Sequence, residues 1–338
     1  MKNILVTGCA GFIGSYVCLK FIEAGCTVVG IDNMNDYYDV SLKIDRLKLL
    51  GIHFDPASFS SSNYNNDKFK FIYSSIEDDS TWSNMELNEP FDLVINLAAQ
   101  AGVRKSLVDP HPYINSNIIG FQKVVDFCVR KNTPLIYASS SSVYGKSIKQ
   151  PFEETFDCNE PESLYAATKR YNELIAYSYF KTHGLKSIGL RFFTVYGPWG
   201  RPDMAPMLFA NSAISDKRIS VFNNGNQSRD FTYISDIVDG IFLIAQKFDY
   251  VFNNAKILNI GRGTPVGLMD FIKYLEIEFD ISYNLEFLPE QSGDVPLTFA
   301  STSLLSNLTD FAPKIDLKAG IQLFVDWYKN YYIHKGQL

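Results

Sequence analysis

A glycine loop near the N-terminus decides the fold: Gly8-Cys9-Ala10-Gly11-Phe12-Ile13-Gly14. It follows directly on the apolar run Ile4-Leu5-Val6, and apolar side chains recur at helical spacing beyond it. Glycines between a strand and a helix let a diphosphate approach the backbone closely, and the helix N-terminus offers it free N–H groups. The succession of strand, G-x-x-G-x-x-G loop and helix therefore predicts a nucleotide-binding unit.

An acidic residue stands where this kind of unit binds ribose. The second apolar run, Thr27-Val28-Val29-Gly30-Ile31, ends at Asp32, eighteen residues beyond Gly14. A carboxylate at this place accepts hydrogen bonds from a ribose 2′-hydroxyl and repels a 2′-phosphate. The sequence therefore favours NAD over NADP as the cofactor.

Apolar, β-branched runs recur along the first part of the chain, with helical patterns between them. Six of these runs are interpreted as buried strands: residues 4–6, 27–31, 69–73, 92–95, 134–137 and 187–190. Alternating strands and helices are typical of a parallel sheet with helices on both faces. We therefore expect an α/β fold with a Rossmann-type, doubly wound parallel sheet. The Ser- and Asn-rich residues 56–68 are expected to form a surface loop.

The pattern becomes irregular after about residue 192. Turn-forming residues crowd the stretch Tyr196-Gly197-Pro198-Trp199-Gly200-Arg201-Pro202, and Asn- and Gly-rich stretches follow. Loops that carry function commonly sit on a rigid scaffold. We expect an NAD-binding Rossmann domain over residues 1–192, to which part of 230–262 returns, and a smaller, loop-rich α/β substrate-binding lobe over 193–338.

The composition excludes several classes of protein. The 338 residues are 46% hydrophobic, and the formal net charge is −6 without a dense Lys/Arg run. A surface that follows nucleic-acid phosphates is therefore not expected. No apolar run approaches the roughly 20 residues of a membrane span. The four histidines lack metal-binding spacing and the five cysteines form no C-x-x-C pair, so we expect no metal site, reduced thiols and a cytoplasmic location.

The pattern Y-x-x-x-K offers a candidate catalytic pair. It occurs five times, at Tyr16/Lys20, Tyr64/Lys68, Tyr165/Lys169, Tyr177/Lys181 and Tyr331/Lys335. Context selects Tyr165 and Lys169, which stand about one helical turn apart and follow the fifth expected strand. That strand runs into Ser139-Ser140-Ser141-Ser142, and ligands of parallel sheets bind at the carboxyl ends of strands.

The chemistry of this pair suits proton transfer. A tyrosine with a pKa near 10 is a poor base at neutral pH, but a neighbouring ammonium stabilises the phenolate. A serine hydroxyl nearby can donate to a substrate oxygen and share the proton. The spacing alone is equally compatible with Tyr165 as a packed aromatic residue and the serines as turn residues at a strand end.

Several motifs together resemble the extended short-chain dehydrogenase/reductase superfamily: TGCAGFIG, Asp32, NLAAQAGVR, ASSSSVYG, YAATK and RFFTVYGPWGRPDMA. Within it, the last segment together with SSSSVYG is most similar to the nucleotide-sugar 4-epimerases that act on UDP-glucuronate. The resemblance implies tightly bound NAD, with contacts from Gly8, Gly11, Phe12, Ile13, Gly14, Asp32, Asn33, Ile76, Leu97, Ala98, Ala99, Asn117, Tyr165, Lys169 and Phe193. It implies Tyr165 as the base, Lys169 as its electrostatic partner, and Ser140 and Ser141 as hydroxyl donors. Substrate-binding roles are implied for Gln100, Arg104, Ser142, Thr194, Arg201, Arg229 and Asp294.

The reaction implied by the resemblance is a redox cycle without net oxidation. The 4-hydroxyl is oxidised, the 4-ketose turns in its pocket, and the hydride returns to the opposite face. Oxidised glucuronate is a β-keto acid, which loses CO₂ readily unless its carboxylate is held. Thr194 and Arg201 match the family's carboxylate-binding positions, Ser142 stands nearby, Arg229 would pair with the UDP diphosphate, and Asp294 would approach the uridine ribose.

Other functions stay open from the sequence. A UDP-glucuronate decarboxylase is chemically close, and a UDP-glucose or UDP-N-acetylhexosamine 4-epimerase is the main rival, against which Arg201 argues. A non-catalytic NAD-binding sensor would have no need of a polarised Tyr165. A 4,6-dehydratase is disfavoured, because it needs an Asp-Glu pair where this chain has Ser140-Ser141-Ser142-Val143. The resemblance also implies a homodimer through the helices that carry residues 115–131 and 161–183. The chain departs from the family's pattern at Lys105, where an aromatic residue is commoner.

Overall fold

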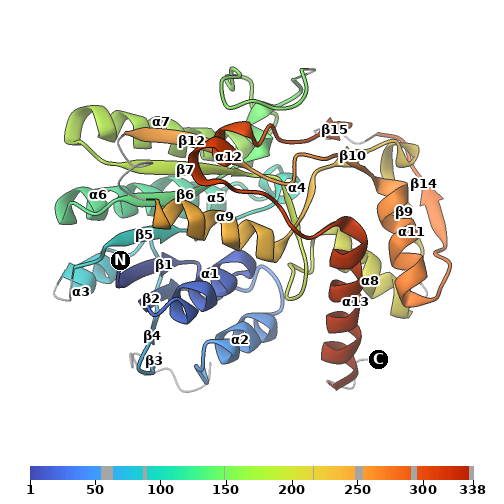
Figure 1. Cartoon of the computed structure of the whole chain (residues 1–338), viewed down its shortest axis with the longest axis horizontal. Coiled ribbons are helices and arrows are strands. Elements are labelled where there is room, and N and C mark those ends of the chain that lie inside the picture. The colour runs from blue at the N-terminus through green and yellow to red at the C-terminus, as the bar shows by residue number, and fades with distance from the viewer. Residues whose placement is uncertain are drawn as a thin grey trace.

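An eight-stranded sheet forms the centre of the molecule (Figure 1). The structure, a computed structural model, describes residues 1–54, 64–86, 90–147, 149–215, 217–247, 254–290 and 295–334. The strands are β1 (Asn3–Thr7), β2 (Thr27–Asp32), β3 (Tyr64–Asn65), β4 (Phe69–Tyr73), β5 (Leu93–Asn96), β6 (Leu135–Ser140), β7 (Ser187–Phe192) and β12 (Ala255–Ile260). Their order is β12-β7-β6-β5-β1-β2-β4-β3, and only the edge strand β3 runs antiparallel to its neighbour. The expected α/β fold with a doubly wound parallel sheet is confirmed.

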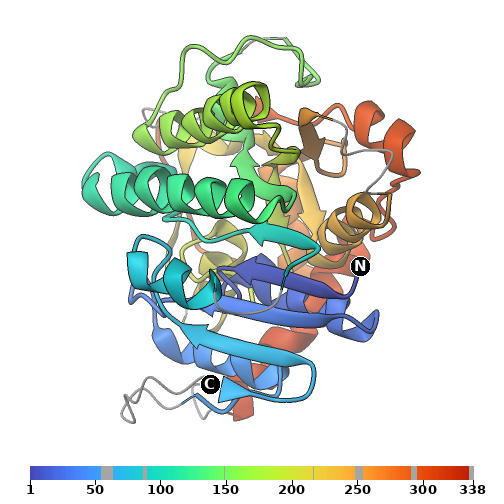
Figure 2. The same ribbon diagram turned by 90° about the vertical axis from the view of Figure 1, so that its left-hand side faces the viewer.

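Helices cover the sheet on both faces, which explains why its strands are continuous apolar runs. In β1, Ile4 and Val6 belong to the core on one face and Leu5 belongs to the core on the other face. All three side chains are completely buried. One face carries α3 (Asp79–Glu86), α6 (Phe121–Lys131) and α7 (Leu164–His183), of which α6 and α7 lie side by side (Figure 2). The other face carries α1 (Phe12–Glu23), α2 (Val40–Leu49) and α9 (Ile234–Gln246).

The strand order creates a natural ligand site at the carboxyl ends of β1 and β5. From β1 the chain moves outward through β2 and β4, and it then crosses back to β5 on the other side of β1. The loops that follow two such strands diverge, and ligands of doubly wound sheets bind between them. The glycine loop follows β1, and residues 97–100 follow β5.

Two strands of the sheet differ from the sequence-based expectation. Strand β12 was not predicted, although it pairs with the whole length of β7, with Leu258 opposite Leu190. The loop predicted for residues 56–68 is wrong at Tyr64–Asn65, because these two residues pair antiparallel with β4 and satisfy part of its edge. Residues 55–63 of that expected loop lie outside the described residues.

The segments after β7 gather largely beside the sheet (Figure 1). Short strands pair there as β8 (Thr194–Tyr196) with β11 (Phe231–Tyr233), β9 (Ile219–Val221) with β14 (Leu285–Phe287), and β10 (Ser228–Arg229) with β13 (Val266–Gly267) and β15 (Leu297–Thr298). The helices of this part, besides α9, are α8 (Ala205–Ser215), α11 (Leu268–Phe279), α12 (Ser303–Thr309) and α13 (Leu317–His334). The expected loop-rich character is wrong for this part, since aromatic residues such as Trp327 and Tyr328 of α13 pack on several sides and hide the helical period.

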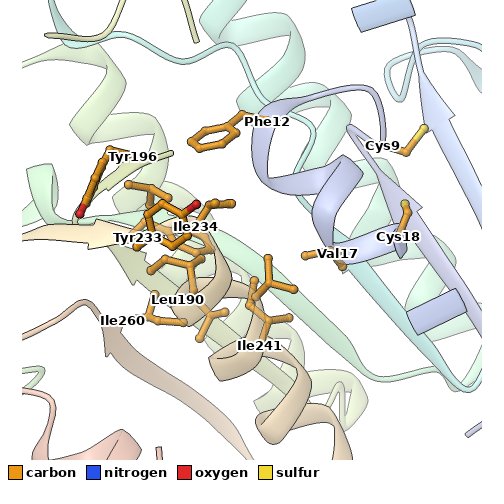
Figure 3. Close-up of a cluster of buried hydrophobic side chains, with 14 of the residues drawn as sticks. Cys9, Phe12, Val17, Cys18, Leu190, Tyr196, Tyr233, Ile234, Ile241 and Ile260 are labelled. Atoms are coloured by element: carbon orange, nitrogen blue, oxygen red, sulfur yellow. The ribbon is translucent and has the colours of Figure 1, made fainter. Parts of the chain in front are cut away.

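Helix α1 connects the glycine loop to this second part of the molecule. Figure 3 shows Val17 of α1 directed toward Ile241 of α9, and Phe12 directed toward Tyr196 and Tyr233. All five residues belong to one buried cluster. The helix that begins at the glycine loop therefore shares its core with segments more than 180 residues away along the chain.

Candidate active site

A cavity of about 760 Å³ opens at the carboxyl ends of the central strands. The described residues that were predicted for cofactor, catalysis or substrate line it with one exception. Those that line it are Gly8, Gly11, Phe12, Ile13, Gly14, Asp32, Asn33, Ile76, Leu97, Ala98, Ala99, Gln100, Arg104, Ser140, Ser141, Ser142, Tyr165, Lys169, Phe193, Thr194, Arg201 and Arg229. This cavity thus brings together predicted residues that lie as far apart in the sequence as Gly8 and Arg229.

Two predicted residues do not appear in that lining. Asn117 lies behind the wall, where it is buried and its side chain accepts a bond from the Gln100 N–H at 2.8 Å and donates to the Gln100 carbonyl at 2.9 Å. It fixes the backbone of a lining residue, and the expected direct cofactor contact from Asn117 has no support in this geometry. Asp294 lies outside the described residues.

The glycine loop has the shape that a diphosphate requires. Gly8 has a φ of +73°, and a side chain there would stand 2.7 Å from the backbone nitrogen of Ala98. A side chain at Gly14 would collide with the Gly8 carbonyl oxygen. Gly11 caps α1 and no side chain takes up the first N–H groups of the helix. Gly11, Phe12, Ile13 and Gly14 line the cavity, so these donors suit a diphosphate bound there.

Asp32 closes the cofactor end of the cavity. Its carboxylate is largely buried and accepts bonds from the backbone N–H groups of Ala10 at 3.1 Å and Met34 at 2.8 Å. The Lys43 ammonium lies 3.9 Å from it. These contacts hold the carboxylate in a fixed orientation beside the glycine loop, where a ribose hydroxyl can donate to it.

Tyr165 and Lys169 project from one face of α7 into the cavity. The Lys169 ammonium lies 6.0 Å from the centre of the Tyr165 ring and donates to the Ala138 carbonyl at 2.9 Å. Burial lowers the pKa of Lys169 to about 8, so it still carries its charge at neutral pH. Burial raises the pKa of Tyr165, whereas the Arg201 charge and a hydrogen bond with Ser140 lower it. The pair is arranged to stabilise a phenolate when a proton leaves.

The serines at the end of β6 form a small hydroxyl cluster beside Tyr165. Ser140 accepts bonds from the Ser142 N–H at 3.2 Å and from the Ser142 hydroxyl at 2.9 Å. This arrangement starts the turn Ser141–Tyr144 and leaves Ser140 next to the Tyr165 hydroxyl. The cluster can therefore pass a proton between Tyr165 and a substrate oxygen.

A buried ion pair anchors α7 to the sheet below this cluster. Glu173 accepts two bonds from Arg191 of β7, both of 2.8 Å, and a third from Ser139 of β6 at 2.6 Å. The Arg191 guanidinium holds the pKa of Glu173 below its ordinary value despite burial. Because Glu173 stands one turn after Lys169, this pair fixes the helix that carries the catalytic candidates.

Arg201 also lines the cavity, in a loop that Arg46 of α2 holds. Arg46 is completely buried and donates to the Trp199 carbonyl at 2.6 Å and 3.1 Å, to the Gly200 carbonyl at 3.4 Å, and to the Ala10 carbonyl at 3.1 Å. One guanidinium therefore ties the glycine loop to the two residues that precede Arg201.

Two residues beside Arg201 were missed from the sequence. Asp203 forms a two-point ion pair with Arg201, and the Tyr37 hydroxyl donates to Asp203 at 3.2 Å. Asp203, two residues after Arg201, could have been found as a neighbouring counter-charge. Tyr37 precedes Asp203 by 166 residues, and no local pattern connects them.

Three further cations, Arg104, Lys105 and Arg229, also line the cavity. Arg229 of β10 donates to the Pro296 carbonyl at 3.2 Å. Arg104 lies 5.0 Å from the centre of the Phe222 ring, and Lys105 lies 5.1 Å from the centre of the Tyr37 ring. Over the described ranges, no group of three or more His, Cys, Asp or Glu residues could hold a metal ion. In the same ranges no helix is long and apolar enough to span a bilayer.

A glycine loop, an acid after the second strand and a Tyr–Lys pair beside serines define the short-chain dehydrogenase/reductase class. Residues 4–261 match the NAD dependent epimerase/dehydratase family. The chain belongs to this family, and NAD is its cofactor.

The chain is similar over nearly its whole length to proteins of known name. Protein CapI of Staphylococcus aureus is 42% identical over 98% of this chain and 99% of its own length. The probable UDP-glucuronate 4-epimerase of Rhizobium meliloti is 39% identical over 97% of each chain. The crystal structure of UDP-glucuronic acid 4-epimerase from Bacillus cereus, in complex with UDP-glucuronic acid and NAD, matches with a TM-score of 0.88. That structure is 32% identical, and the match covers 98% of this chain and 100% of the other.

Proposed function

We propose that this protein interconverts UDP-glucuronate and UDP-galacturonate by transient oxidation at carbon 4, with NAD that stays bound through each cycle. The observation that carries the proposal is a single cavity lined by two groups of residues. It holds the Tyr165–Lys169 pair beside Ser140, and it also holds Arg201 and Thr194, which suit a carboxylate. The relatives named as UDP-glucuronate 4-epimerases support the same substrate.

The glycine loop and Asp32 would hold the cofactor, which would supply the acceptor for the hydride that leaves carbon 4 of the sugar. Tyr165, as phenolate, takes the proton of the 4-hydroxyl, and Ser140 and Ser141 donate to the same oxygen. The Lys169 ammonium stabilises the phenolate, and Phe193 covers the reacting end. When the ketose has turned and a hydride returns to carbon 4, Tyr165 would return its proton to the carbon 4 oxygen, which becomes the new hydroxyl.

The carboxylate of the sugar needs a binding site of its own while the ketose turns. The oxidised uronate is a β-keto acid, and it loses CO₂ most easily when the bond to its carboxylate lies perpendicular to the carbonyl plane. Arg201 and Thr194, with Ser142 nearby, would bind the carboxylate and oppose that alignment. Gln100 and Arg104 would line the sugar path, Arg229 would bind the UDP diphosphate through a planar fork, and Asp294 would approach the uridine ribose.

We also propose the organisation of the protein around this site. Residues 1–192 form the NAD-binding domain, with part of 230–262 returning to it, and residues 193–338 form the substrate lobe. The packing of α9 against α1 and the pairing of β12 with β7 support this division. The half-exposed apolar residues Ile119, Leu174 and Tyr177 on the helices of 115–131 and 161–183 support a homodimer. The five buried, unpaired cysteines support a cytoplasmic location, and a polysaccharide pathway would consume the uronate product.

The decisive experiment is incubation of the purified protein with UDP-glucuronate, without added NAD, while NMR follows the anomeric protons. The expected product is UDP-galacturonate, approached to the same equilibrium from either sugar. UDP-xylose or a 4-keto pentose as the main product would identify a decarboxylase. Exclusive turnover of UDP-glucose or a UDP-N-acetylhexosamine would identify the neutral-sugar epimerase, and NAD binding without any turnover would identify a sensor.

A further inference from the structure

The guanidinium of Arg201 already has a carboxylate of its own. Arg201 Nε lies 3.0 Å from one oxygen of Asp203, and Nη2 lies 2.5 Å from the other. Both residues line the cavity, and their side chains are 20% and 33% exposed. A guanidinium is planar, and a two-point contact along one edge fixes the direction of the whole plane. Asp203 therefore sets the orientation of Arg201.

Tyr37 holds this pair in place from a distant segment. Its hydroxyl donates to Asp203 at 3.2 Å, and the Arg201 guanidinium lies 5.6 Å from the centre of its ring. Burial and the Asp203 charge both raise the pKa of Tyr37, so that the hydroxyl keeps its proton and remains a donor. The Tyr37 hydroxyl packs closely against Gly102. A Cβ atom at residue 102 would stand 2.7 Å from the Tyr37 oxygen, so a glycine there leaves room for Tyr37.

The second edge of Arg201 stays available. Asp203 occupies the edge formed by Nε and Nη2, and Nη1 donates to no partner among the described residues. A substrate carboxylate can therefore bind in the guanidinium plane along the edge formed by Nη1 and Nη2. Its attraction would come chiefly from directed hydrogen bonds, because Asp203 already balances the Arg201 charge.

We propose that Asp203, supported by Tyr37, is a positioning residue that turns Arg201 so that the substrate carboxylate is held away from the alignment for CO₂ loss. This proposal rests on the proposed function. In the step that is avoided, the bond between carbons 5 and 6 of the 4-ketose breaks. Its electron pair forms an enolate with the carbon 4 carbonyl, CO₂ leaves, and a proton then adds to carbon 5. In this proposal Asp203 acts through Arg201, and no contact with the reacting atoms or the cofactor is assigned to it.

The test compares Asp203→Asn with the wild-type enzyme, each purified with its cofactor and given UDP-glucuronate. Asparagine keeps the shape but removes the charge and one of the two strong acceptors. NMR counts UDP-galacturonate against UDP-xylose and the 4-keto pentose. The expected result is an increase of about 10-fold or more in the decarboxylated fraction, with the KM for UDP-glucuronate unchanged or lower, because Arg201 is then less neutralised and less fixed.

Two further variants keep the test decisive. Tyr37→Phe retains the ring and removes only the hydroxyl bond, so it should raise the decarboxylated fraction in the same direction by about 2- to 3-fold. Asp310→Asn is the matched control, since Asp310 forms an exposed ion pair with Lys247, and it should leave the product ratio at the wild-type value.

The outcomes separate this proposal from the proposed function. If Asp203→Asn lowers kcat equally on UDP-glucuronate and UDP-glucose with an unchanged product ratio, Asp203 is only structural and the proposal is overturned. If Asp203→Asn does not fold, an unchanged ratio in Tyr37→Phe overturns it instead. A wild-type enzyme that epimerises only UDP-glucose overturns the proposed function itself, and the positioning role with it.

Discussion

The two walls of the cavity are assembled in different ways. The cofactor wall, made of the glycine loop, Asp32 and Leu97, consists of segments that stand at or directly after the ends of β1, β2 and β5. The sugar wall, made of Tyr37, Arg201, Asp203 and Arg229, comes from connecting segments and short strands that meet only in the folded chain. Sheet register places the first wall. Individual polar contacts place the second.

This difference teaches where the protein tolerates change. A residue at a strand end is held by the ladder of backbone bonds on both sides, and moving it requires moving the sheet. Arg201 is held by one carboxylate, one aromatic ring and the carbonyls before it. Substitutions in the cofactor wall should therefore abolish function outright, whereas substitutions in the sugar wall should change which substrate or product is favoured.

The largest effect is expected for Gly14→Ala in the cofactor wall. The added methyl group would meet the Gly8 carbonyl, so the loop must open and the diphosphate site is lost. We expect the purified variant to contain no NAD and to show no turnover. Cofactor release on denaturation measures the bound NAD, and the NMR assay measures turnover. Gly25→Ala is the control for backbone strain, because alanine is strained at its φ of +87° but nothing lies within 4 Å of the position of its methyl group, so this variant should keep bound NAD. If Gly14→Ala retained bound NAD, the glycine loop would not be the diphosphate site.

The next effect is expected for Tyr165→Phe. Loss of an acid–base group costs about 10²- to 10⁴-fold in rate, while the glycine loop and Asp32 are untouched. We expect turnover to fall by this amount with NAD still bound. The NMR assay measures the first quantity, and cofactor release measures the second. Residual activity above a tenth of wild type would remove Tyr165 from the role of base.

A smaller and more selective effect is expected for Arg201→Ala in the sugar wall. A charge-assisted hydrogen bond contributes about 1.5–3 kcal/mol, which corresponds to roughly 10- to 150-fold in kcat/KM on UDP-glucuronate. The kcat/KM on a UDP-sugar without a carboxylate should fall much less. Parallel kinetics on UDP-glucuronate and UDP-glucose measure the ratio. Equal losses on both would show that Arg201 supports the fold and not the acid group.

The smallest effect concerns the stability of the cofactor-free protein at alkaline pH. Burial lowers the pKa of Lys169 to about 8, against 10.5 as the ordinary value. The unfolded chain therefore binds more protons than the folded chain between these two pH values, and the penalty for burying the charge is relieved as pH rises through 8. Relative to Lys169→Met, the wild-type free energy of unfolding should increase by about 1 kcal/mol between pH 8 and pH 9. Urea unfolding at both pH values measures this difference, and a constant difference would contradict the lowered pKa.

The sequence predicted the parts of the molecule that local spacing controls. The glycine loop, Asp32 and the Tyr165–Lys169 pair each follow an expected strand or share one helical face, and all of them line the cavity. Strand β12 escaped prediction because its sequence, AKILNI, lies far from the other strands and after an irregular segment. Only its pairing with β7 makes it part of the sheet.

The contacts around Arg201 could not be predicted for a related reason. The resemblance selected Arg201, but it did not indicate that Tyr37 and Arg46 hold its loop. These contacts join segments more than 150 residues apart, and they depend on how α2 packs against α1. Asn117 illustrates the same limit, because its amide supports Gln100 from behind and has no place in the cavity lining.

The buried guanidinium of Arg46 has a consequence for how this enzyme can diversify. Every bond that it makes to the loop before Arg201 goes to a backbone carbonyl, and none goes to a side chain of that loop. These bonds hold the loop at Trp199 and Gly200, while the positive φ of Gly197 and the packing of Trp199 on Trp327 make its path depend on those two residues as well. A substitution at Arg201 itself leaves every one of these bonds in place, so the glycine loop and the Arg201 loop remain joined. A change of sugar preference made at Arg201 therefore does not require the scaffold around it to be rebuilt.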